Sequence, residues 1–145
     1  MIKIICLGKL KEQYLVDLTN DYLKRINKYH KIELIELKDE EDLSIEAKNI
    51  AKYIGNNDYV ITLEVEGKNI RSEELASLID STFITNSTIT FIIGSSTGLH
   101  ESIKKRSNYA LSFSKFTFPH GLFRGILLEQ IYRAFKINNH ESYHK

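Results

Sequence analysis

The stretch FSKFTFPH, residues 113–120, has an unusual composition for a loop in this 145-residue sequence. It contains three phenylalanines, one lysine and the only proline of the chain, Pro119. It follows a strand-like run and precedes a long apolar helical pattern. Surface loops are normally more polar and richer in turn-forming residues. An apolar loop at this place raises the question of what it holds.

A second candidate segment is GSSTG, residues 94–98, which follows a strand-like run and precedes a helical one. Its glycines permit a tight turn and a close approach of the backbone to a ligand. Backbone amides at the start of the next helix can bind an anion. The spacing fits neither the dinucleotide pattern GxGxxG nor the P-loop pattern. Taken alone, the segment is better interpreted as a plain turn between strand and helix.

The C-terminal residues include groups that can bind anions or move protons. Glu129 and Arg133 stand four apart in a helical pattern and can pair, either as a surface ion pair or as a half-buried pair lining a site. The tail NNHESYHK, residues 138–145, carries Tyr143, two histidines and a lysine. A frayed chain end is the ordinary interpretation of such a tail.

The apolar residues alternate between strand-like and helical spacing along the chain. The third strand is expected to end in a turn at Gly67, and Ser72 is expected to cap the helix that follows. The expected strands cover residues 2–8, 31–38, 58–67, 88–94 and 108–114, and the expected helices cover 11–29, 44–54, 72–83, 99–107 and 119–137.

Strands that alternate with helices predict one α/β domain over residues 1–145, with a mainly parallel sheet covered by helices on both faces. Ligands of such sheets bind beyond the carboxyl ends of the strands. The three segments to watch are therefore Leu63–Gly67, Gly94–Leu99 and Phe113–His120.

The last helix is apolar over most of its circumference between residues 122 and 137. Such a helix must be covered on several faces. We expect a subunit interface to supply part of the cover. The alternative is a central helix inside the monomer.

The net charge of +1 conceals an asymmetry, because residues 102–145 carry eight Lys/Arg and two Asp/Glu, whereas residues 33–101 carry five and fourteen. The basic end fits a polyanionic partner, although charges that interleave in the fold would explain it equally well. The single cysteine, Cys6, lies in an apolar run and excludes an intrachain disulfide. No metal-binding cluster of Cys and His is present. The N-terminal apolar run is too short for a signal peptide or membrane span, so a cytoplasmic protein is expected.

The segments GKLKE, ITLEVEGK (61–68), IIGSSTGLH (92–100) and RSNYALSFSKFTFPHGLFRGILLEQIYRAFKI with the terminal SYHK together resemble the ribosomal RNA large subunit methyltransferase H family of the SPOUT class. The resemblance covers the whole chain. It implies a SPOUT fold whose C-terminal part forms a trefoil knot, an exception to the rule against threaded chains. It also implies a homodimer that binds S-adenosylmethionine and methylates N3 of a pseudouridine in 23S rRNA on the assembled ribosome.

The resemblance also assigns roles to residues. The loop after the fifth strand is implied to hold the adenine of the cofactor, and the cofactor-binding positions are Leu63, Gly94, Phe113, Ser114, Lys115, Phe116, Thr117 and Phe118. Ser95 stands where the family usually has a second glycine, so its side chain could crowd or bond to the cofactor. The candidates for assisting methyl transfer on the substrate side are Glu129, Arg133, Tyr143 and His144.

Two other functions compete with a methyltransferase. A non-catalytic ribosome-binding or assembly factor would keep the fold but would not need a cofactor loop. A nucleotide-dependent enzyme that uses residues 94–98 lacks the phosphate-binding fingerprint. Titration with S-adenosylmethionine separates the first alternative from the enzyme.

Overall fold

The computed structural model describes residues 1–145, and every expected strand and helix is present. Element boundaries differ from the expected ones by a few residues. In chain order the elements are β1 (Ile2–Leu7), α1 (Gln13–Asn27), β2 (Ile32–Leu37), α2 (Leu43–Ala51), β3 (Tyr59–Asn69), α3 (Ser72–Thr85), β4 (Ile89–Ile93), α4 (Glu101–Arg106), β5 (Tyr109–Ser112) and α5 (His120–Asn138).

The five strands form one sheet in the order β2-β1-β4-β3-β5, and all neighbouring strands run parallel. The predicted single α/β domain with a parallel sheet is therefore confirmed. This order brings the carboxyl ends of β4, β3 and β5 side by side at one edge of the sheet, where ligands of such folds bind.

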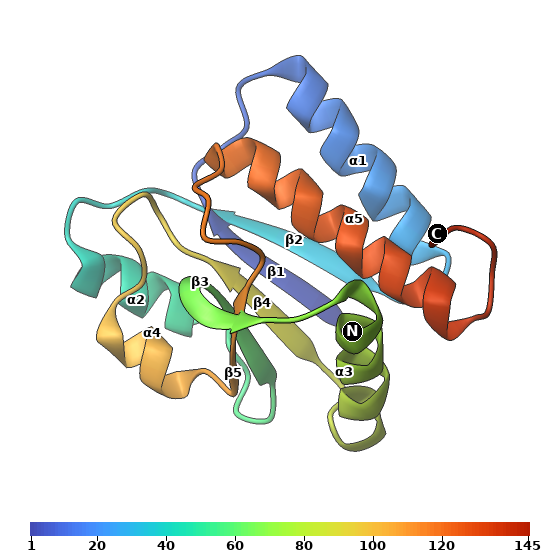
Figure 1. Cartoon of the computed structure of the whole chain (residues 1–145). Helices are drawn as coiled ribbons and strands as arrows, with labels where there is room; N and C mark the ends of the chain where they lie inside the picture. The colour runs from blue at the N-terminus through green and yellow to red at the C-terminus, as the bar shows by residue number, and fades with distance from the viewer.

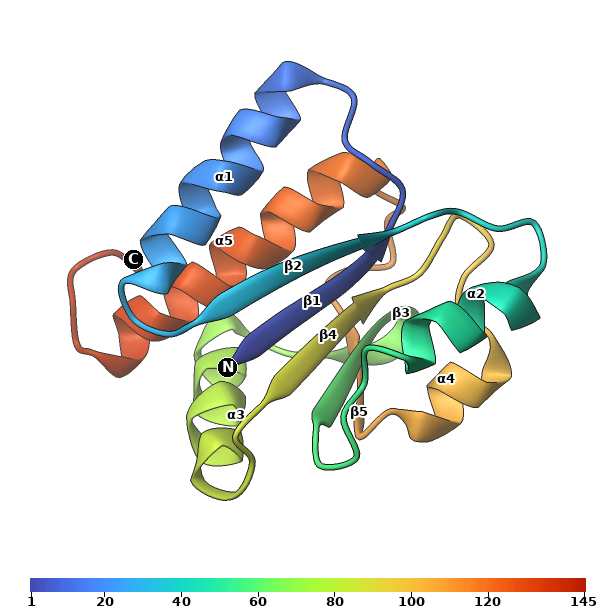
Figure 2. The same cartoon turned by 180° about the vertical axis from the view of Figure 1, so that it is seen from behind.

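Helices cover both faces of the sheet (Figures 1 and 2). Helices α1, α3 and α5 pack on one face, and α2 and α4 pack on the other. The side chains of β1 contribute alternately to the two hydrophobic cores. Ile4 and Cys6 belong to the larger core under α5, whereas Ile5 and Leu7 belong to the smaller core under α2 and α4. Successive side chains of a strand point to opposite faces, so every position from Ile4 to Leu7 must be apolar to fill both cores.

The end of β3 differs from the prediction of a turn at Gly67. The strand continues to Asn69, and its pairing with β5 shifts between Leu63 and Lys68, both of which lie opposite Leu111. The extra residues form a bulge that bends the strand over the end of β5. Gly67 is required by packing, because a Cβ atom there would lie 2.8 Å from the backbone of Ala110.

Helix α5 is a central helix of the monomer. It lies beside α1 and α3 on the sheet, and its buried residues include Leu127, Leu128 and Ile131 (Figure 1). The apolar circumference is thus largely covered within one chain, and it does not by itself require a subunit interface.

Buried Arg124 fixes the first turns of α5. Its guanidinium lies 2.5 Å from the carboxylate of Glu36 on β2 and donates to the carbonyl of Gly8 at 3.2 Å. Pro119 is the residue before the helix rather than its first residue. At α3 the prediction that Ser72 caps the helix is wrong, because Arg71 holds that position and the Ser72 hydroxyl donates to Gln130 of α5 at 2.7 Å.

Candidate functional site

The principal cavity lies at the carboxyl ends of β3, β4 and β5 and has a volume of about 500 Å³. Three segments surround it: the bulge of β3, the loop after β4 and the loop after β5. Of the eight residues predicted to bind a cofactor, Lys115 alone does not line this cavity; the seven that do are Leu63, Gly94, Phe113, Ser114, Phe116, Thr117 and Phe118.

The apolar loop 113–118 is held by its own aromatic side chains. Phe113 and Phe118 pack on Phe123 of α5, with ring centroids 5.2 and 5.7 Å away. The Ser114 hydroxyl accepts a hydrogen bond from the Phe116 amide at 3.0 Å. No turn hydrogen bond joins the backbone groups of residues 113–118 to one another, although the Ser114 carbonyl accepts from the Ser112 hydroxyl at 3.2 Å. Phe116 is 78% exposed at the cavity.

The loop 94–98 closes on itself. The Gly98 amide donates to the Ser95 carbonyl at 2.9 Å, and the Ser95 hydroxyl lies 2.9 Å from that of Thr97. Ser95 therefore bonds within its own loop. A Cβ atom at Gly94 would lie 2.9 Å from the Gly98 carbonyl oxygen, so the tight turn itself requires glycine.

The alternative considered for residues 94–98, an anion site at the start of a helix, is not formed. Helix α4 begins later, at Glu101, and Nδ1 of His100 accepts from the Ser102 amide at 3.1 Å. The cap of α4 is thus filled by a side chain of the protein.

Charged groups at the cavity come from two elements. Glu64 and Glu66 reach it from the β3 bulge, and Lys104 reaches it from α4. Nζ of Lys104 lies 3.7 Å from Oε1 of Glu64, whose side chain is 14% exposed. The cavity therefore combines apolar walls with a net excess of carboxylate, which suits a ligand that has a flat apolar part and a cationic part.

The tail does not fray, and it joins the four candidate residues of the substrate side into one network. Arg133 donates twice to Oε1 of Glu129, at 3.0 and 2.6 Å, and its guanidinium lies 4.8 Å from the centre of the Tyr143 ring. The Tyr143 hydroxyl donates to the same oxygen at 3.0 Å. Nη1 of Arg133 reaches Nδ1 of His144 at 3.1 Å. We call Glu129, Arg133, Tyr143 and His144 the tail cluster.

Two members of the tail cluster are poorly suited to accept a proton. Burial, followed by hydrogen bonds that include the one to Glu129, raises the pKa of Tyr143 above its usual range, so the phenol stays protonated. Both carboxylate oxygens of Glu129 already accept hydrogen bonds, Oε2 from Gln130 at 2.8 Å. Proton transfer by this cluster would therefore fall to the imidazole.

The tail cluster and the cavity are separate in one chain. No member of the tail cluster lines the cavity, whose last lining residue is Phe123. Glu129 lies six residues further along α5, a rise of about 9 Å along the helix axis.

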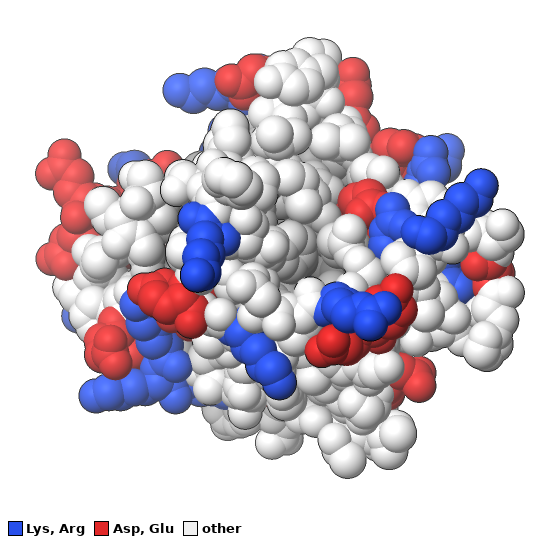
Figure 3. All heavy atoms as spheres, viewed as in Figure 1, with Lys and Arg blue, Asp and Glu red and all other residues white.

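The charged residues of the chain interleave in space. On the face shown in Figure 3, Lys and Arg atoms lie next to Asp and Glu atoms rather than in one basic area. The ion pairs Lys104–Glu64 at 3.7 Å and Arg124–Glu36 at 2.5 Å join basic residues of the C-terminal third to acidic residues of the middle of the chain. Arg106 is also occupied, because it donates to the carbonyls of Gly55 and Asp58. Interleaving in the fold, one of the two explanations of the charge asymmetry, therefore accounts for part of the basic C-terminal third.

Sequence reasoning missed several residues of both sites. His120 lines the cavity, and its Nε2 lies 3.2 Å from the Leu7 carbonyl; burial lowers the pKa of this imidazole and keeps it neutral. Glu73 of α3 contacts His144. His120 sat inside a segment already singled out, whereas nothing in the sequence points from Glu73 to a residue 71 positions away.

The structure contains no second candidate site in the form of a metal-binding cluster, a membrane-spanning helix or a reactive thiol. No group of three or more His, Cys, Asp or Glu side chains is arranged to hold a metal ion. None of the helices has the length and apolar character needed to cross a membrane. Cys6 is buried, and burial raises the pKa of its thiol to about 12.

Comparison with known proteins defines the class. The family described as "Predicted SPOUT methyltransferase" matches residues 1–144. A solved structure of a probable methylase family protein from Haemophilus influenzae shares the fold, with a TM-score of 0.57 and 14% identity over 99% of this chain and 70% of that one. The parallel sheet, with its cavity at the carboxyl ends of the strands, is thus that of a SPOUT methyltransferase.

Full-length relatives narrow the assignment. Ribosomal RNA large subunit methyltransferase H from Clostridium botulinum strain Alaska E43 is 51% identical, with 99% of both chains covered. The protein of the same name from strain Eklund 17B is 49% identical with equal coverage. The chain belongs to the ribosomal RNA large subunit methyltransferase H family of SPOUT methyltransferases.

Proposed function

We propose that this protein is an S-adenosylmethionine-dependent methyltransferase that methylates N3 of a pseudouridine in 23S rRNA, with the assembled ribosome as its substrate. The observation that carries the proposal is the cavity at the ends of β3, β4 and β5, in a chain that matches rRNA methyltransferases over its full length.

The cavity fits the cofactor in shape and charge. S-adenosylmethionine supplies, when bound, a methyl group already activated on a cationic sulfur, so the chemistry needs no metal. Phe113, Leu63 and the loop backbone suit the flat adenine, which is apolar on its faces and polar at its edge. The carboxylates of Glu64 and Glu66 suit the cationic part. In this proposal Lys115, which lies outside the cavity, contributes to the loop by its backbone alone.

The tail cluster would act on the RNA. Arg133 would bind a phosphate or a carbonyl oxygen of the target base, because a guanidinium presents a rigid fork of donors. Tyr143 would stack on a base turned out of its helix. The proton on N3 must leave before or during attack, and His144 is the member of the cluster suited to receive it.

A homodimer would bring these parts together. Within one chain the tail cluster lies away from the cavity, so His144 is not next to the cavity of its own chain. A second copy could place its tail beside the first copy's cavity. Val65 and Phe116, which line the cavity and are 56% and 78% exposed, form apolar surface that such a partner would cover. We likewise propose that the chain around loop 113–118 forms the trefoil knot of the family.

The decisive experiment measures methyl incorporation from tritiated S-adenosylmethionine into ribosomes, isolated large subunits and naked 23S rRNA. Labelling of whole ribosomes, mapped to N3 of a pseudouridine by mass spectrometry of the rRNA, is expected. Cofactor binding by calorimetry without any labelling would favour a binding factor, and labelling of a different base or atom would contradict the proposed specificity. Light scattering that returns 16.8 kDa rather than twice that mass would contradict the dimer.

A further inference from the structure

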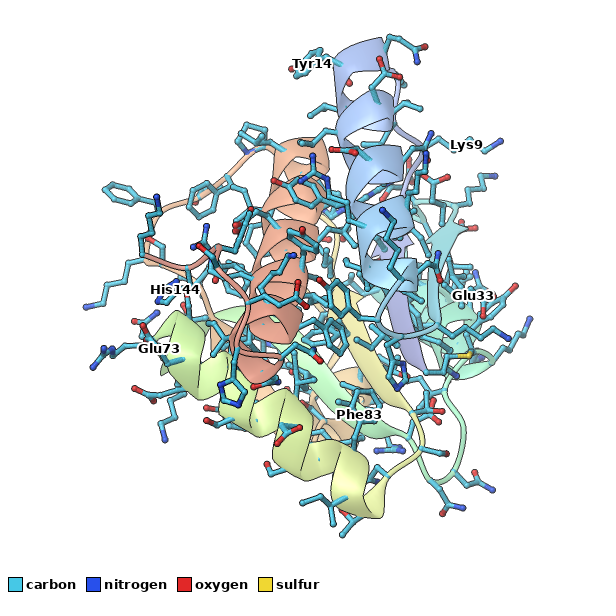
Figure 4. The ribbon with its side chains drawn as sticks, turned by 90° about the vertical axis from the view of Figure 1, so that its right-hand side faces the viewer. Lys9, Tyr14, Glu33, Glu73, Phe83 and His144 are labelled. Carbon is cyan, nitrogen blue, oxygen red and sulfur yellow. The ribbon has the colours of Figure 1, made fainter.

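Glu73, in the first turn of α3, makes a contact to which the proposed function assigns no role. Its Oε1 atom lies 2.5 Å from Nε2 of His144. Figure 4 shows the two residues close together, one on α3 and the other on the tail that returns along α5. The second carboxylate oxygen of Glu73 pairs with Nε of Arg71 at 3.3 Å.

The partners of His144 determine which ring nitrogen carries the proton. A guanidinium can donate hydrogen bonds but cannot accept them. Nδ1 of His144, 3.1 Å from Nη1 of Arg133, must therefore be the unprotonated nitrogen. The single ring proton is then on Nε2, which donates it to Glu73. This tautomer follows from the hydrogen-bond partners on both sides of the ring.

We propose that Glu73 is a positioning residue for methyl transfer: it holds His144 in the tautomer and orientation in which Nδ1 accepts the N3 proton of the target base. The inference rests on the proposed function. Glu73 acts through His144 and does not touch the substrate itself. The arrangement follows a general rule, in which a carboxylate on one ring nitrogen orients an imidazole whose other nitrogen does the chemistry.

Arg133 covers Nδ1 in the free chain and must move before the proton can be received. An RNA phosphate or base carbonyl offers the guanidinium another acceptor, and its departure exposes Nδ1. The N3–H bond then breaks as the Nδ1–H bond forms. The electron pair left on N3 forms the new bond to the methyl carbon, and the carbon–sulfur bond breaks with its electron pair on sulfur. The imidazolium that results lies against the negative charge of Glu73.

The charged groups around His144 are accounted for from both packed elements. Glu73 contacts it from the first turn of α3 and pairs in turn with Arg71, while Arg133 contacts it from α5 and pairs in turn with Glu129. The pKa of the Glu73 carboxyl is held below its usual value, chiefly by the hydrogen bond from His144. Glu73 is therefore an anion at neutral pH and can serve as the acceptor.

The first test is made on the free full-length protein and does not depend on activity. Nitrogen-15 NMR of the histidine rings, with the His144 signals assigned from the His144→Ala variant, should find the proton on Nε2. Glu73→Gln retains an acceptor oxygen and should keep this pattern, whereas Glu73→Ala should lose it. A wild-type ring protonated at Nδ1 alone, or a pattern unchanged in Glu73→Ala, would overturn the inference.

The second test measures turnover with ribosomes. Glu73→Ala should lower kcat roughly tenfold to a hundredfold, with cofactor affinity and the KM for ribosomes within about twofold of wild type. The kcat of Glu73→Gln should lie between those of Glu73→Ala and wild type, because glutamine keeps an acceptor that orients His144 but lacks the negative charge. Glu74→Gln, a change at the exposed neighbouring residue, is the matched control. Equal kcat in Glu73→Ala and wild type refutes the role of Glu73, whereas a wild-type protein that transfers no methyl group refutes the proposed function instead.

Discussion

The cavity and the tail cluster are built on opposite principles. The cavity is formed by backbone turns and apolar side chains, and neither Gly94 in its wall nor Gly67 in the adjoining bulge of β3 leaves room for a Cβ atom. The tail cluster is formed by charged and polar side chains whose hydrogen bonds are made to one another and to neighbouring Glu73 and Gln130. A shape-based site should fail when volume is added, and a network should fail when a partner is removed. The two regions can therefore be damaged separately.

The largest separation of the two regions is expected from deletion of residues 142–145. The deletion removes Tyr143 and His144 but no residue that lines the cavity. Methyl transfer to ribosomes should fall by roughly 10²–10⁴-fold, the usual contribution of a positioned acid or base. Calorimetry should find cofactor affinity within about twofold of wild type.

Two single substitutions locate the effect within the tail. His144→Ala should reproduce most of the loss in turnover while RNA affinity changes less, and Lys145→Ala should leave turnover close to wild type. Full activity in the truncated protein would return the tail to the status of a structural extension.

The converse experiment adds volume at the cavity. Gly94→Val places its side chain against the Gly98 carbonyl and Leu99, both of which lie 2.9 Å from the position that a Cβ atom would take, so the loop 94–98 must open. Cofactor affinity should fall about a hundredfold, equal to about 2.7 kcal/mol, while far-ultraviolet circular dichroism remains that of the folded protein.

Gly98→Ala is the matched comparison within the same loop. An alanine Cβ at this position would meet nothing within 4 Å. The only energetic cost of the substitution is the backbone strain of an alanine at a φ of 88°. A smaller loss of affinity is expected, about 1–2 kcal/mol at most. If Gly94→Val binds the cofactor as wild type does, Gly94 does not shape the site.

A third substitution asks whether the shape of the cavity region also supports the fold. Gly67→Ala sets a methyl group 2.8 Å from the backbone of Ala110 and Leu111, where neither strand can yield easily. Urea denaturation should report a loss of about 1–3 kcal/mol in the free energy of unfolding.

Gly121→Ala provides the control for Gly67→Ala. Its neighbours are the flexible side-chain ends of Leu10 and Leu15, and alanine favours the helix that contains it. Stability should therefore stay within about 1 kcal/mol of wild type. Equal losses in the two variants would mean that the bulge of β3 has no special role.

The sequence predicts these regions unequally. The alternation of apolar strands and amphipathic helices is local, so every element and the cavity-forming segments could be placed from the chain alone. The bulge at Gly67 was missed because it depends on pairing with β5, which lies on the far side of α3, β4 and α4 in the chain. A glycine after an alternating run is, by contrast, typical of a turn.

The tail cluster was only half predictable. Its members were recognisable as residue types suited to chemistry, and Glu129 and Arg133 stand at helical spacing. Their arrangement was not recognisable, because Glu73, which contacts His144, is brought to the cluster by packing of α3 on α5. Tertiary hydrogen bonds between distant side chains leave no periodic signal in a sequence.

The smallest effect is expected from charge outside both regions. Lys104 and Lys105 on α4 remain the basic candidates for RNA contact near the cavity, because Arg106 is engaged by the carbonyls of Gly55 and Asp58 and should be left intact. Lys105 is exposed, and Lys104 forms only a long pair with Glu64. Replacing both lysines by alanine should weaken ribosome binding a few-fold and reduce the slope of log affinity against log salt by about one to two.

Lys52→Ala, a change at the exposed lysine that ends neighbouring α2, should leave the slope unchanged. Since phosphate contacts orient RNA without selecting a base, the double variant should still modify the same nucleotide. An affinity and slope equal to those of wild type would mean that α4 presents a solvated surface, and that the RNA is held by the cavity rim and the tail cluster alone.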